Sequence, residues 1–351
     1  MILLGLCSVL AARSGGQVSP ETNPQRVPGH GKVTINVVVT DKQGHPVRGL
    51  TANDFTLTDN DQPQTLAGFK ALDAEATDAP VHTVIVVDMV NVPFQMTAWG
   101  REELGKFLKE DGGKLANPTS LAVMTQNGLK LEPNATMDGN VLMSSLDTLR
   151  TQLRPINRNG GFYAAGEMLE MSLRQISQLA AYEAAKPGHK LILVISPGLP
   201  LLPRAGDQED MTQRKWVFDS VVALTNGLRE ADITLYSLDT YELGRTDPFY
   251  YQSFLKPVKK ADGAEYPNLG LKVVAMHSGG QAQVTGRDIT GELNTTVRDA
   301  TASYELTFES VPGDGPNEYH ALKVMVGRPD VTVPTTAGYY ANVQGATNKK
   351  K

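Results

Sequence analysis

The chain has 351 residues, which is enough for about two domains with their own hydrophobic cores. Hydrophobic residues make up 40% of the chain and charged residues 20%, a globular composition that excludes a fibrous or largely disordered protein. The formal net charge of −5 argues against a general nucleic-acid binder, because neutralising phosphates requires a basic surface.

The first residues resemble an export signal. An apolar run from residue 2 to residue 12 is followed by small residues and glycines, as in the apolar and cleavage regions of a secretory signal peptide. No positively charged segment precedes the apolar run, which a start codon assigned too far downstream would explain. The alternative to a signal peptide is that the run forms a short buried strand. We expect a truncated signal peptide over residues 1–16, too short to span a membrane, and a linker over residues 17–31. Cys7 is the only cysteine, so a cleaved chain would have neither a disulfide nor a thiolate nucleophile.

Alternating apolar and polar residues mark two β segments, one toward each end of the chain. Residues 32–72 contain short alternating runs separated by turns rich in Asp, Asn and Gly, and residues 303–342 return to the same pattern. Neither segment alone has enough strands to bury a core, so we expect the two to form one small antiparallel module similar to a β-sandwich. A disordered tail is expected over residues 343–351.

Between these segments, residues 80–302 alternate between strand-like and helix-like patterns. We expect strands at residues 81–87, 120–125, 190–198, 233–240 and 279–286, and helices at residues 99–110, 141–153, 166–185, 216–230 and 288–303. The strands are apolar almost throughout, which is typical of strands buried on both faces. The pattern predicts an α/β fold with a doubly wound, mostly parallel sheet inserted into the β module.

The stretch VIVVDMVNVPF, residues 84–94, places the carboxylate of Asp88 at the end of the first of these strands. In an open α/β sheet, ligands bind outside the carboxyl ends of the strands, where the strand order reverses, so Asp88 is the candidate site residue. Three roles are open to it: a metal ligand, a catalytic base, or an acceptor that caps backbone N–H groups of its own loop or the following helix. We favour the capping role.

A set of segments in a fixed order carries a family resemblance. The segments VVVTDKQGHPVRGLTANDFTLTDNDQPQTLAGF, VVDMVNVP, SGGQAQV, YELTF and AGYY together resemble the von Willebrand factor A-related proteins abundant in Acidobacteria. Each segment alone is weak, but the set covers residues 33–342. The resemblance implies a von Willebrand factor A-like doubly wound sheet inserted into a small antiparallel β-sandwich-like module.

The resemblance also implies a metal-ion-dependent adhesion site, of which Asp88 matches the first ligand. The other positions carry side chains that cannot coordinate a metal: Val90 and Val92 stand in place of two serines, Phe162 in place of a threonine and Pro197 in place of an aspartate. The adhesion site is therefore degenerate, and we expect no metal.

An atypical metal site is one alternative. Its ligands would be the oxygens of Asp88, Asn91, Ser196 and Asp239, which would have to converge within coordination distance. An envelope hydrolase that uses Asp88 as a general base is another alternative, and it would need a partner with a shifted pKa in a closed pocket.

No catalytic motif accompanies Asp88. The sequence contains no Gly-x-Ser-x-Gly elbow, no phosphate-binding loop and no His-Glu-x-x-His zinc motif. The six histidines are dispersed without ligand spacing, and we expect His45, in a turn, and His189, before a strand, at the surface. We therefore expect a protein that is not an enzyme, with no catalytic residue and no cofactor.

Apolar and aromatic residues follow the same strand ends as Asp88. Residues 240–254 are rich in Tyr and Phe and residues 197–204 in Pro and Leu, which are residue types of binding surfaces. The candidate partner-binding rim consists of Asp88, Asn91, Phe94, Pro200, Leu201, Tyr241, Phe249 and Tyr250. The alternative is that these residues simply cover the sheet edge.

From these patterns we expect an exported protein that is periplasmic, envelope-associated or secreted. It would bind a protein or another envelope macromolecule through the rim, without a nucleic-acid partner and without a transmembrane span.

Overall fold

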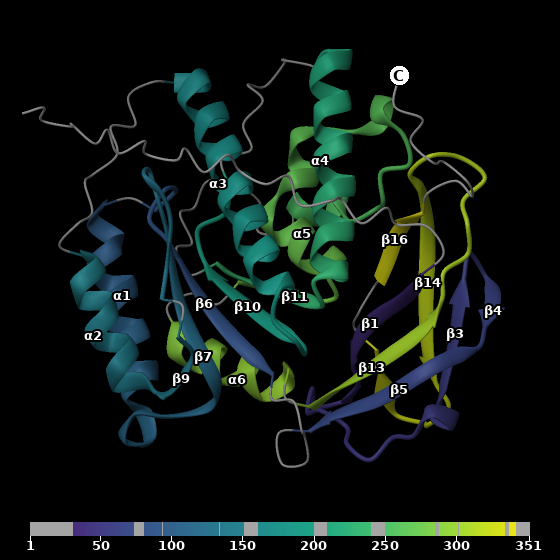
Figure 1. Cartoon of the computed structure of the whole chain (residues 1–351), viewed down its shortest axis with the longest axis horizontal. Coiled ribbons are helices and arrows are strands. Elements are labelled where there is room, and N and C mark those ends of the chain that lie inside the picture. The colour runs from purple at the N-terminus through teal and green to yellow at the C-terminus, as the bar shows by residue number, and fades with distance from the viewer. Residues whose placement is uncertain are drawn as a thin grey trace, which may run out of the picture.

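The computed structural model describes residues 31–73, 81–92, 94–132, 134–150, 161–199, 209–239, 250–284, 288–300, 302–333 and 337–341. It is a mixed α/β fold with a mostly parallel central sheet and several antiparallel sheets beside it (Figure 1). The expected signal peptide, the tail and nearly all of the expected linker lie outside the described residues.

The strands are β1 (Lys32–Val38), β2 (Thr40–Asp41), β3 (Phe55–Asp59), β4 (Gln62–Gln64), β5 (Leu66–Asp73), β6 (His82–Asp88), β7 (Lys114–Thr125), β8 (Gly128–Leu131), β9 (Thr136–Asp138), β10 (Lys190–Ile195), β11 (Ile233–Asp239), β12 (Ala282–Val284), β13 (Ala302–Glu309), β14 (Glu318–Val326), β15 (Val331–Thr332) and β16 (Ala337–Ala341). The α-helices are α1 (Phe94–Lys109), α2 (Gly139–Arg150), α3 (Gly161–Ala184), α4 (Met211–Glu230), α5 (Leu271–His277) and α6 (Ile289–Ala300). Short 3-10 helices are η1 (Ala52–Asp54), η2 (Glu110–Gly113), η3 (Tyr250–Phe254), η4 (Ala261–Gly263) and η5 (Tyr266–Leu269).

The central sheet has the strand order β12-β11-β10-β6-β7-β8, and β9 also pairs with β7. Strands β12, β11, β10, β6 and β7 are parallel, whereas β8 and β9 run antiparallel to β7. From β6 the chain moves to β7 on one side and later returns to β10 on the other side. The order therefore reverses between β6 and β10, and the carboxyl ends of these two strands form the switch point where ligands bind in such sheets.

Helices cover both faces of the central sheet because successive strand residues point to opposite faces. Val84 and Val86 of β6 join the core beneath α3, α4 and α5. Ile85 joins a second core with α1, α2 and α6. Strand β10 is buried along its whole length, which explains its continuous apolar run. The unit is doubly wound.

Strands from the two ends of the chain pair with each other in the β module (Figure 1). Strand β13 lies between β1 and β5, β14 lies between β16 and β3, and β2 pairs with β15. Their inward side chains form a separate core that contains Leu57, Leu306 and Phe308. The β segments before and after the central unit therefore share one core.

Helix α4 joins the central unit to the edge strand β16. The Asn226 side-chain amide donates to the carbonyl of Tyr340 (2.9 Å) and accepts from its backbone N–H (3.2 Å). The Tyr340 hydroxyl donates to the carbonyl of Val258 (2.9 Å). Asn226 thus pairs with the strand edge as a neighbouring strand would, which satisfies backbone groups that an edge leaves open.

The structure extends the sequence-based expectations in several places. Helices α1, α3 and α4 each begin about five residues earlier than expected, and β8 and β9 were not predicted. Strand β7 begins at Lys114 rather than at residue 120, although it contains Pro118; the ladder with β9 is irregular there, which accommodates a residue without an N–H. Residues 250–277, for which the pattern predicted no regular element, form η3, η4, η5 and α5. No helix in the described ranges is long and apolar enough to cross a membrane.

Candidate functional site at the ends of β6 and β10

Asp88 lies at the switch point and is fully buried. Its Oδ1 accepts hydrogen bonds from the backbone N–H groups of Val90 (2.8 Å) and Asn91 (3.0 Å). Its Oδ2 accepts from Asn91 Nδ2 (2.7 Å) and from the hydroxyl of Ser196 (2.6 Å). Four donors therefore occupy the four acceptor positions that a carboxylate offers.

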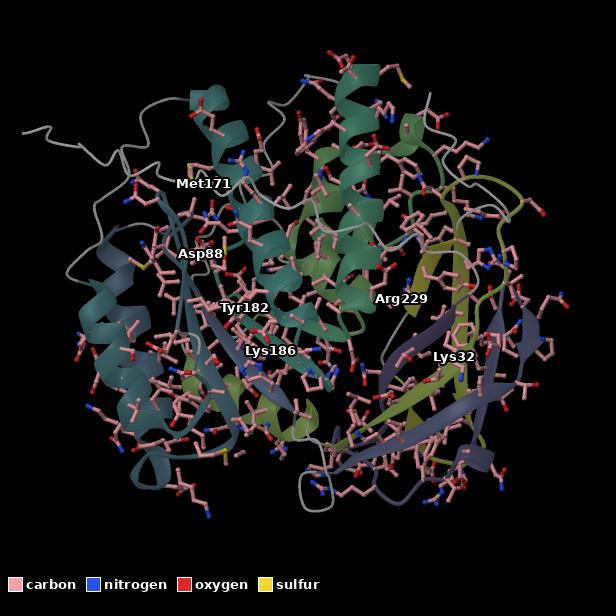
Figure 2. The ribbon with its side chains drawn as sticks, viewed as in Figure 1. Lys32, Asp88, Met171, Tyr182, Lys186 and Arg229 are labelled. Carbon is pink, nitrogen blue, oxygen red and sulfur yellow. The ribbon has the colours of Figure 1, made fainter. Side chains whose placement is uncertain are left out.

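A second layer of contacts fixes these donors. Ser196 directly follows β10, and its Oγ accepts from the N–H of Gly198 (3.0 Å), a residue in the left-handed region at φ +99°. Asn91 Nδ2 also donates to Ser172 Oγ on α3 (3.0 Å), and Ser172 donates to the carbonyl of Met168 (2.8 Å). Figure 2 shows Asp88 beside α3, near Met171. The loop after β6 is thus fastened to its own residues, to β10 and to α3.

The electrostatics of Asp88 combine two opposing effects. Burial raises the pKa of the Asp88 carboxyl, while the hydrogen bonds from Ser196, Asn91 and Val90 favour the ionised form and act against the rise. Asn91 Oδ1 is buried and, among the described residues, has no hydrogen-bond partner. A cation at Asp88 would have to displace donors whose hydrogens already point at the carboxylate.

The other residues of the atypical metal site do not complete a coordination sphere. Asp239 ends β11, which β10 separates from β6, and its carboxylate pairs with Lys272 Nζ on α5 (2.7 Å). Val90 and Val92 are buried, and Val90 belongs to the core beneath α3 and α4. Within the described part of the chain, no group of three or more His, Cys, Asp or Glu side chains could hold a metal ion. The donor set around Asp88 therefore does not fit a divalent cation.

The structure describes only part of the expected rim. Tyr250, in η3, is 43% exposed, and its ring packs edge-on against Phe254 at a centroid distance of 5.1 Å. Pro200, Leu201, Tyr241 and Phe249 lie outside the described residues, as do the side chains of Phe94 and Phe162.

An aromatic patch lies at the amino end of α4 and along η3 and η5; the sequence pattern indicated its part at residues 250–254 but not its residues on α4 and η5. We define it as Met211, Trp216, Tyr250, Phe254 and Tyr266. The rings of Trp216 and Tyr266 are 6.1 Å apart, and Asn268 Nδ2 donates to the carbonyl of Phe254 (3.5 Å), which links η5 to η3. Met211 is 61% exposed and Trp216 37%. Both α4 and η3 follow carboxyl ends of strands, as Asp88 does.

Carboxylates border this aromatic patch. Glu209 accepts from the N–H of Tyr266 (3.2 Å) and approaches the Arg214 guanidinium at 3.8 Å. Burial, followed by the charges of Glu265 and Glu209, raises the pKa of Tyr250. Burial and the charges of Glu209 and Asp210 do the same for Tyr266. The two tyrosine hydroxyls therefore share one negative neighbour.

A second polar cluster lies at the opposite, amino end of the sheet. His82 Nε2 is 2.9 Å from Ser120 Oγ, and His82 Nδ1 is 3.0 Å from Glu183 Oε2. These distances match a Ser-His-Glu triad, but Ser120 and Glu183 are fully buried, so no substrate carbonyl can reach the hydroxyl. Lys186 Nζ also binds Glu183 (2.8 Å) and lies over the ring of Tyr182, beside which Figure 2 shows it. The cluster joins α3 to the sheet.

The expectation that His189 lies at the surface is wrong. His189 is only 4% exposed, and its Nδ1 lies 3.0 Å from Asp232 Oδ1 and 3.0 Å from Asn36 Nδ2 on β1. The polar segment before β10 is buried because the β module covers this end of the central unit. His45, by contrast, lies in an exposed turn with Asp41.

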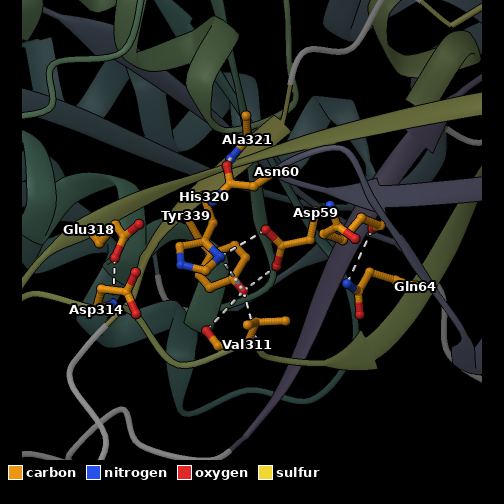
Figure 3. A network of polar contacts seen from close by, with 10 residues as sticks. Asp59, Asn60, Gln64, Val311, Asp314, Glu318, His320, Ala321 and Tyr339 are labelled. Carbon is orange, nitrogen blue, oxygen red and sulfur yellow. Dashed lines mark hydrogen bonds and ion pairs between the residues drawn. The ribbon is translucent and has the colours of Figure 1, made fainter.

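A third buried network crosses the β module (Figure 3). Asp59 Oδ1 is 2.8 Å from His320 Nδ1, and the Tyr339 hydroxyl donates to Asp59 Oδ2 (2.6 Å). The backbone N–H of Val311 donates to the Tyr339 hydroxyl (3.1 Å). Burial and the Asp59 carboxylate raise the pKa of Tyr339 far above its ordinary value. These side chains tie β3, β14 and β16 together.

No protein-family model and no curated protein matches the sequence. Several solved structures show a low degree of similarity. A pilus adhesin, SpaC from Lactobacillus rhamnosus GG in its open conformation, has 9% identity and a TM-score of 0.38, with 83% of this chain and 48% of that chain covered. The human COPII-coat protein Sec24c has 8% identity and a TM-score of 0.33, with 78% and 46% covered. The N-terminal domain of TFIIH p34 has 18% identity and a TM-score of 0.23, with 46% and 81% covered.

The chain spans about half the length of the adhesin and coat-protein structures. All three TM-scores lie below 0.5, which is too low to indicate a shared function.

Proposed function

We propose that this protein is an exported, non-catalytic binding protein that contacts another protein through the aromatic patch of a von Willebrand factor A-like unit. The sequence resemblance and the strand order, with its reversal between β6 and β10, support the von Willebrand factor A-like part of the proposal. The export part rests on the apolar N-terminal segment.

The exposed aromatic patch is the observation that carries the proposal. Trp and Tyr are the residues most enriched in binding hot spots, because they bury a large area and lose little side-chain entropy. Trp216, Tyr250 and Met211 each expose more than a third of their surface. Contiguous exposed apolar groups with a polar border are typical of partner surfaces.

The closed site at Asp88 supports a role without metal or catalysis. A general base needs a free lone pair within reach of a substrate proton, and both oxygens of Asp88 are taken by donors in a buried position. We assign Asp88 the role of holding the loop after β6 against β10 and α3.

A photo-crosslinking comparison tests the proposal. We would place p-benzoylphenylalanine at Tyr250 and, as a matched control, at Tyr182, which is 40% exposed on α3 at the other end of the sheet. A protein captured from cells of the source organism at position 250 alone would be purified and its affinity measured. We expect Trp216→Ala and Tyr250→Ala to weaken binding about tenfold or more, and Tyr182→Ala to leave it unchanged. Equal capture at both positions, or equal affinities, would refute the proposal.

A further inference from the structure

The 3-10 helix η3 carries Tyr250 and Phe254 of the aromatic patch but contains no buried residue. Inside η3 the two rings pack edge-on, and the N–H of Leu255 donates to the carbonyl of Gln252 (3.3 Å). Burial of apolar side chains is the main force that holds an element against its neighbours, and η3 offers little of it. The position of η3 therefore depends on polar and ring contacts with the elements beside it, which include η5 and α5.

Two carbonyl groups at the end of η3 are bound by side chains of the following elements. Asn268 Nδ2, on η5, donates to the carbonyl of Phe254 (3.5 Å), and His277 Nε2, at the end of α5, lies 3.0 Å from the carbonyl of Leu255. Because a carbonyl only accepts, this second contact places a proton on Nε2 of His277. Both contacts hold the part of η3 that carries the Phe254 ring of the patch.

Lys272, near the start of α5, makes a third contact. Its Nζ lies 5.5 Å from the centroid of the Tyr251 ring, within the range of a cation–π interaction. The same Nζ is 2.7 Å from Asp239 Oδ2 at the carboxyl end of β11. Lys272 thus links η3 to the edge of the central sheet at which ligands bind in open α/β folds.

The His277 imidazole makes this set of contacts sensitive to pH. Its ring is half-buried, and burial lowers the pKa of His277 below its ordinary 6.5, while the hydrogen bond to Leu255 acts in the opposite direction. The neutral ring, with its proton on Nε2, is therefore the form that fits between α5 and η3. Protonation favours any arrangement that exposes the ring to water.

No carboxylate among the described residues forms an ion pair with His277 that would offset its burial. Of the elements packed against α5, η3, β12 and β16 carry no charged side chain. Arg229 and Asp232 share the wall of a small hollow with His277, but they pair with Glu230 and His189 respectively. The remaining charged groups on or beside those elements are the pairs of Asp239 with Lys272 and of Lys215 with Asp219, and Arg214, Lys256 and Glu265.

We propose that Asn268, Lys272 and His277 form a clasp that positions η3 for partner binding, and that protonation of His277 opens the clasp. This inference rests on the proposed function of the aromatic patch and adds its regulation. In the open clasp the imidazole takes up a proton near its ordinary pKa of 6.5, and in the closed clasp only at lower pH. The closed clasp is thus fully stable above pH 6.5 and loses stability as the pH falls through the lowered pKa of His277.

A ¹⁹F NMR titration of the full chain tests the clasp without a partner. We would place para-fluorophenylalanine at position 254 and, in a second sample, at Phe218 on α4, whose half-buried ring packs against Tyr340. Between about pH 8 and about pH 5, a range that brackets the ordinary histidine pKa, the resonance at position 254 should shift. The resonance at position 218 should stay in place and show that the fold is intact.

Two variants separate the donor from the titrating group. His277→Gln keeps an N–H donor near the position of Nε2 but takes up no proton, so we expect the shift at position 254 to lose its pH dependence. His277→Phe keeps a ring and loses the donor, so its resonance at position 254 should resemble that of the acid wild type at every pH. An unchanged titration in His277→Gln would overturn the proposal, as would a wild-type resonance that does not move or a joint shift of both labels.

The clasp and the proposed function can fail separately. An intact ¹⁹F response together with failed crosslinking at position 250 would refute partner binding at the patch but not the pH-sensitive mounting of η3. Where both experiments succeed, the affinity for the captured protein should fall as the pH drops below 6.5 in the wild type and stay constant in His277→Gln. An affinity with the same pH dependence in both proteins would overturn the regulatory role of His277.

Discussion

The hydroxyl of Ser196 lies 2.6 Å from the carboxylate of Asp88, across the point where the strand order of the central sheet reverses. In open α/β sheets this position usually receives a ligand. Here it is filled by an intramolecular hydrogen bond between the last residue of β6 and the first residue after β10. The two residues therefore close the crevice that their strands create.

Removal of the Ser196 hydroxyl tests this closure. We expect Ser196→Ala to lower the free energy of unfolding by about 1.5–3 kcal/mol, because a buried hydrogen bond to a charged group is lost. Urea denaturation would measure the change, with Ser144→Ala on the exposed face of α2 as the control. An effect no larger than that of Ser144→Ala would show that the contact does not stabilise the loop.

Substitution of Asp88 itself should lower the free energy of unfolding more than Ser196→Ala does. Asp88→Asn replaces one oxygen by an amino group that faces donors, so we expect a larger destabilisation than in Ser196→Ala. The same denaturation experiment measures both variants. Equal stability of Asp88→Asn and the wild type would contradict the assignment of Asp88 as a structural acceptor.

The pH dependence of stability reports on the buried pair of Glu183 and His82. Burial opposes ionisation of Glu183, but the hydrogen bonds and charges of His82 and Lys186 outweigh it and lower the pKa of Glu183 below its ordinary 4.5. A lowered folded-state pKa contributes stability above the unfolded-state value, and this stability is lost as the pH falls through the folded-state value.

We therefore expect the wild type to lose stability as the pH falls below 4.5, and Glu183→Gln to lose less over the same range. Denaturation at a series of pH values would show the difference as a change of slope. Glu170→Gln, at an exposed carboxylate on α3, is the control. Parallel pH profiles for wild type and Glu183→Gln would exclude the assigned role of the pair.

Replacing a glycine by alanine should change the stability of the protein in opposite directions at positions 338 and 227. A Cβ at Gly338 would lie 1.9 Å from the Tyr319 hydroxyl and 2.8 Å from the carbonyl of His320, so Gly338→Ala should destabilise by about 1–3 kcal/mol. A Cβ at Gly227, inside α4, meets nothing within 4 Å, so Gly227→Ala should stabilise by about 1 kcal/mol. Thermal denaturation of both variants measures the signs. A Gly338→Ala variant as stable as the wild type would contradict the close packing of β16 against β14.

The hydrophobic pattern of the sequence was sufficient to predict the features that depend on residues close together in the chain. The apolar run of residues 190–195 predicted a strand buried on both faces, and its burial in β10 follows from helices on either side. The position of Asp88 at the end of a strand could also be predicted, because the apolar run stops at this carboxylate. The elements formed by residues 250–277 could not be predicted, because the apolar residues of this stretch recur with neither the period of 2 of a strand nor the period of 3.6 of a helix.

The partners of Asp88 illustrate contacts between distant residues, which the sequence pattern does not predict. Ser196, which the sequence placed near Asp88 only as a ligand of the atypical metal site, is 108 residues away, and its hydroxyl meets Asp88 because β10 pairs with β6. The Asn91 contact with Ser172 likewise depends on how α3 crosses the sheet. His82 and Glu183 are 101 residues apart, and neither has a motif that indicates the other. Spacing along the chain cannot predict such pairs because strand order and helix position determine them.

The most direct test of the closed site is a calorimetric titration of the purified protein with Mg²⁺, Mn²⁺ and Ca²⁺, beside an Asp88→Ala variant that circular dichroism shows to be folded. With four donors on the Asp88 carboxylate, we expect no binding heat up to millimolar metal in either protein. Micromolar binding to the wild type that is lost in Asp88→Ala would contradict this expectation. It would mean that the loops rearrange into a metal site and that partner binding is bridged by the metal.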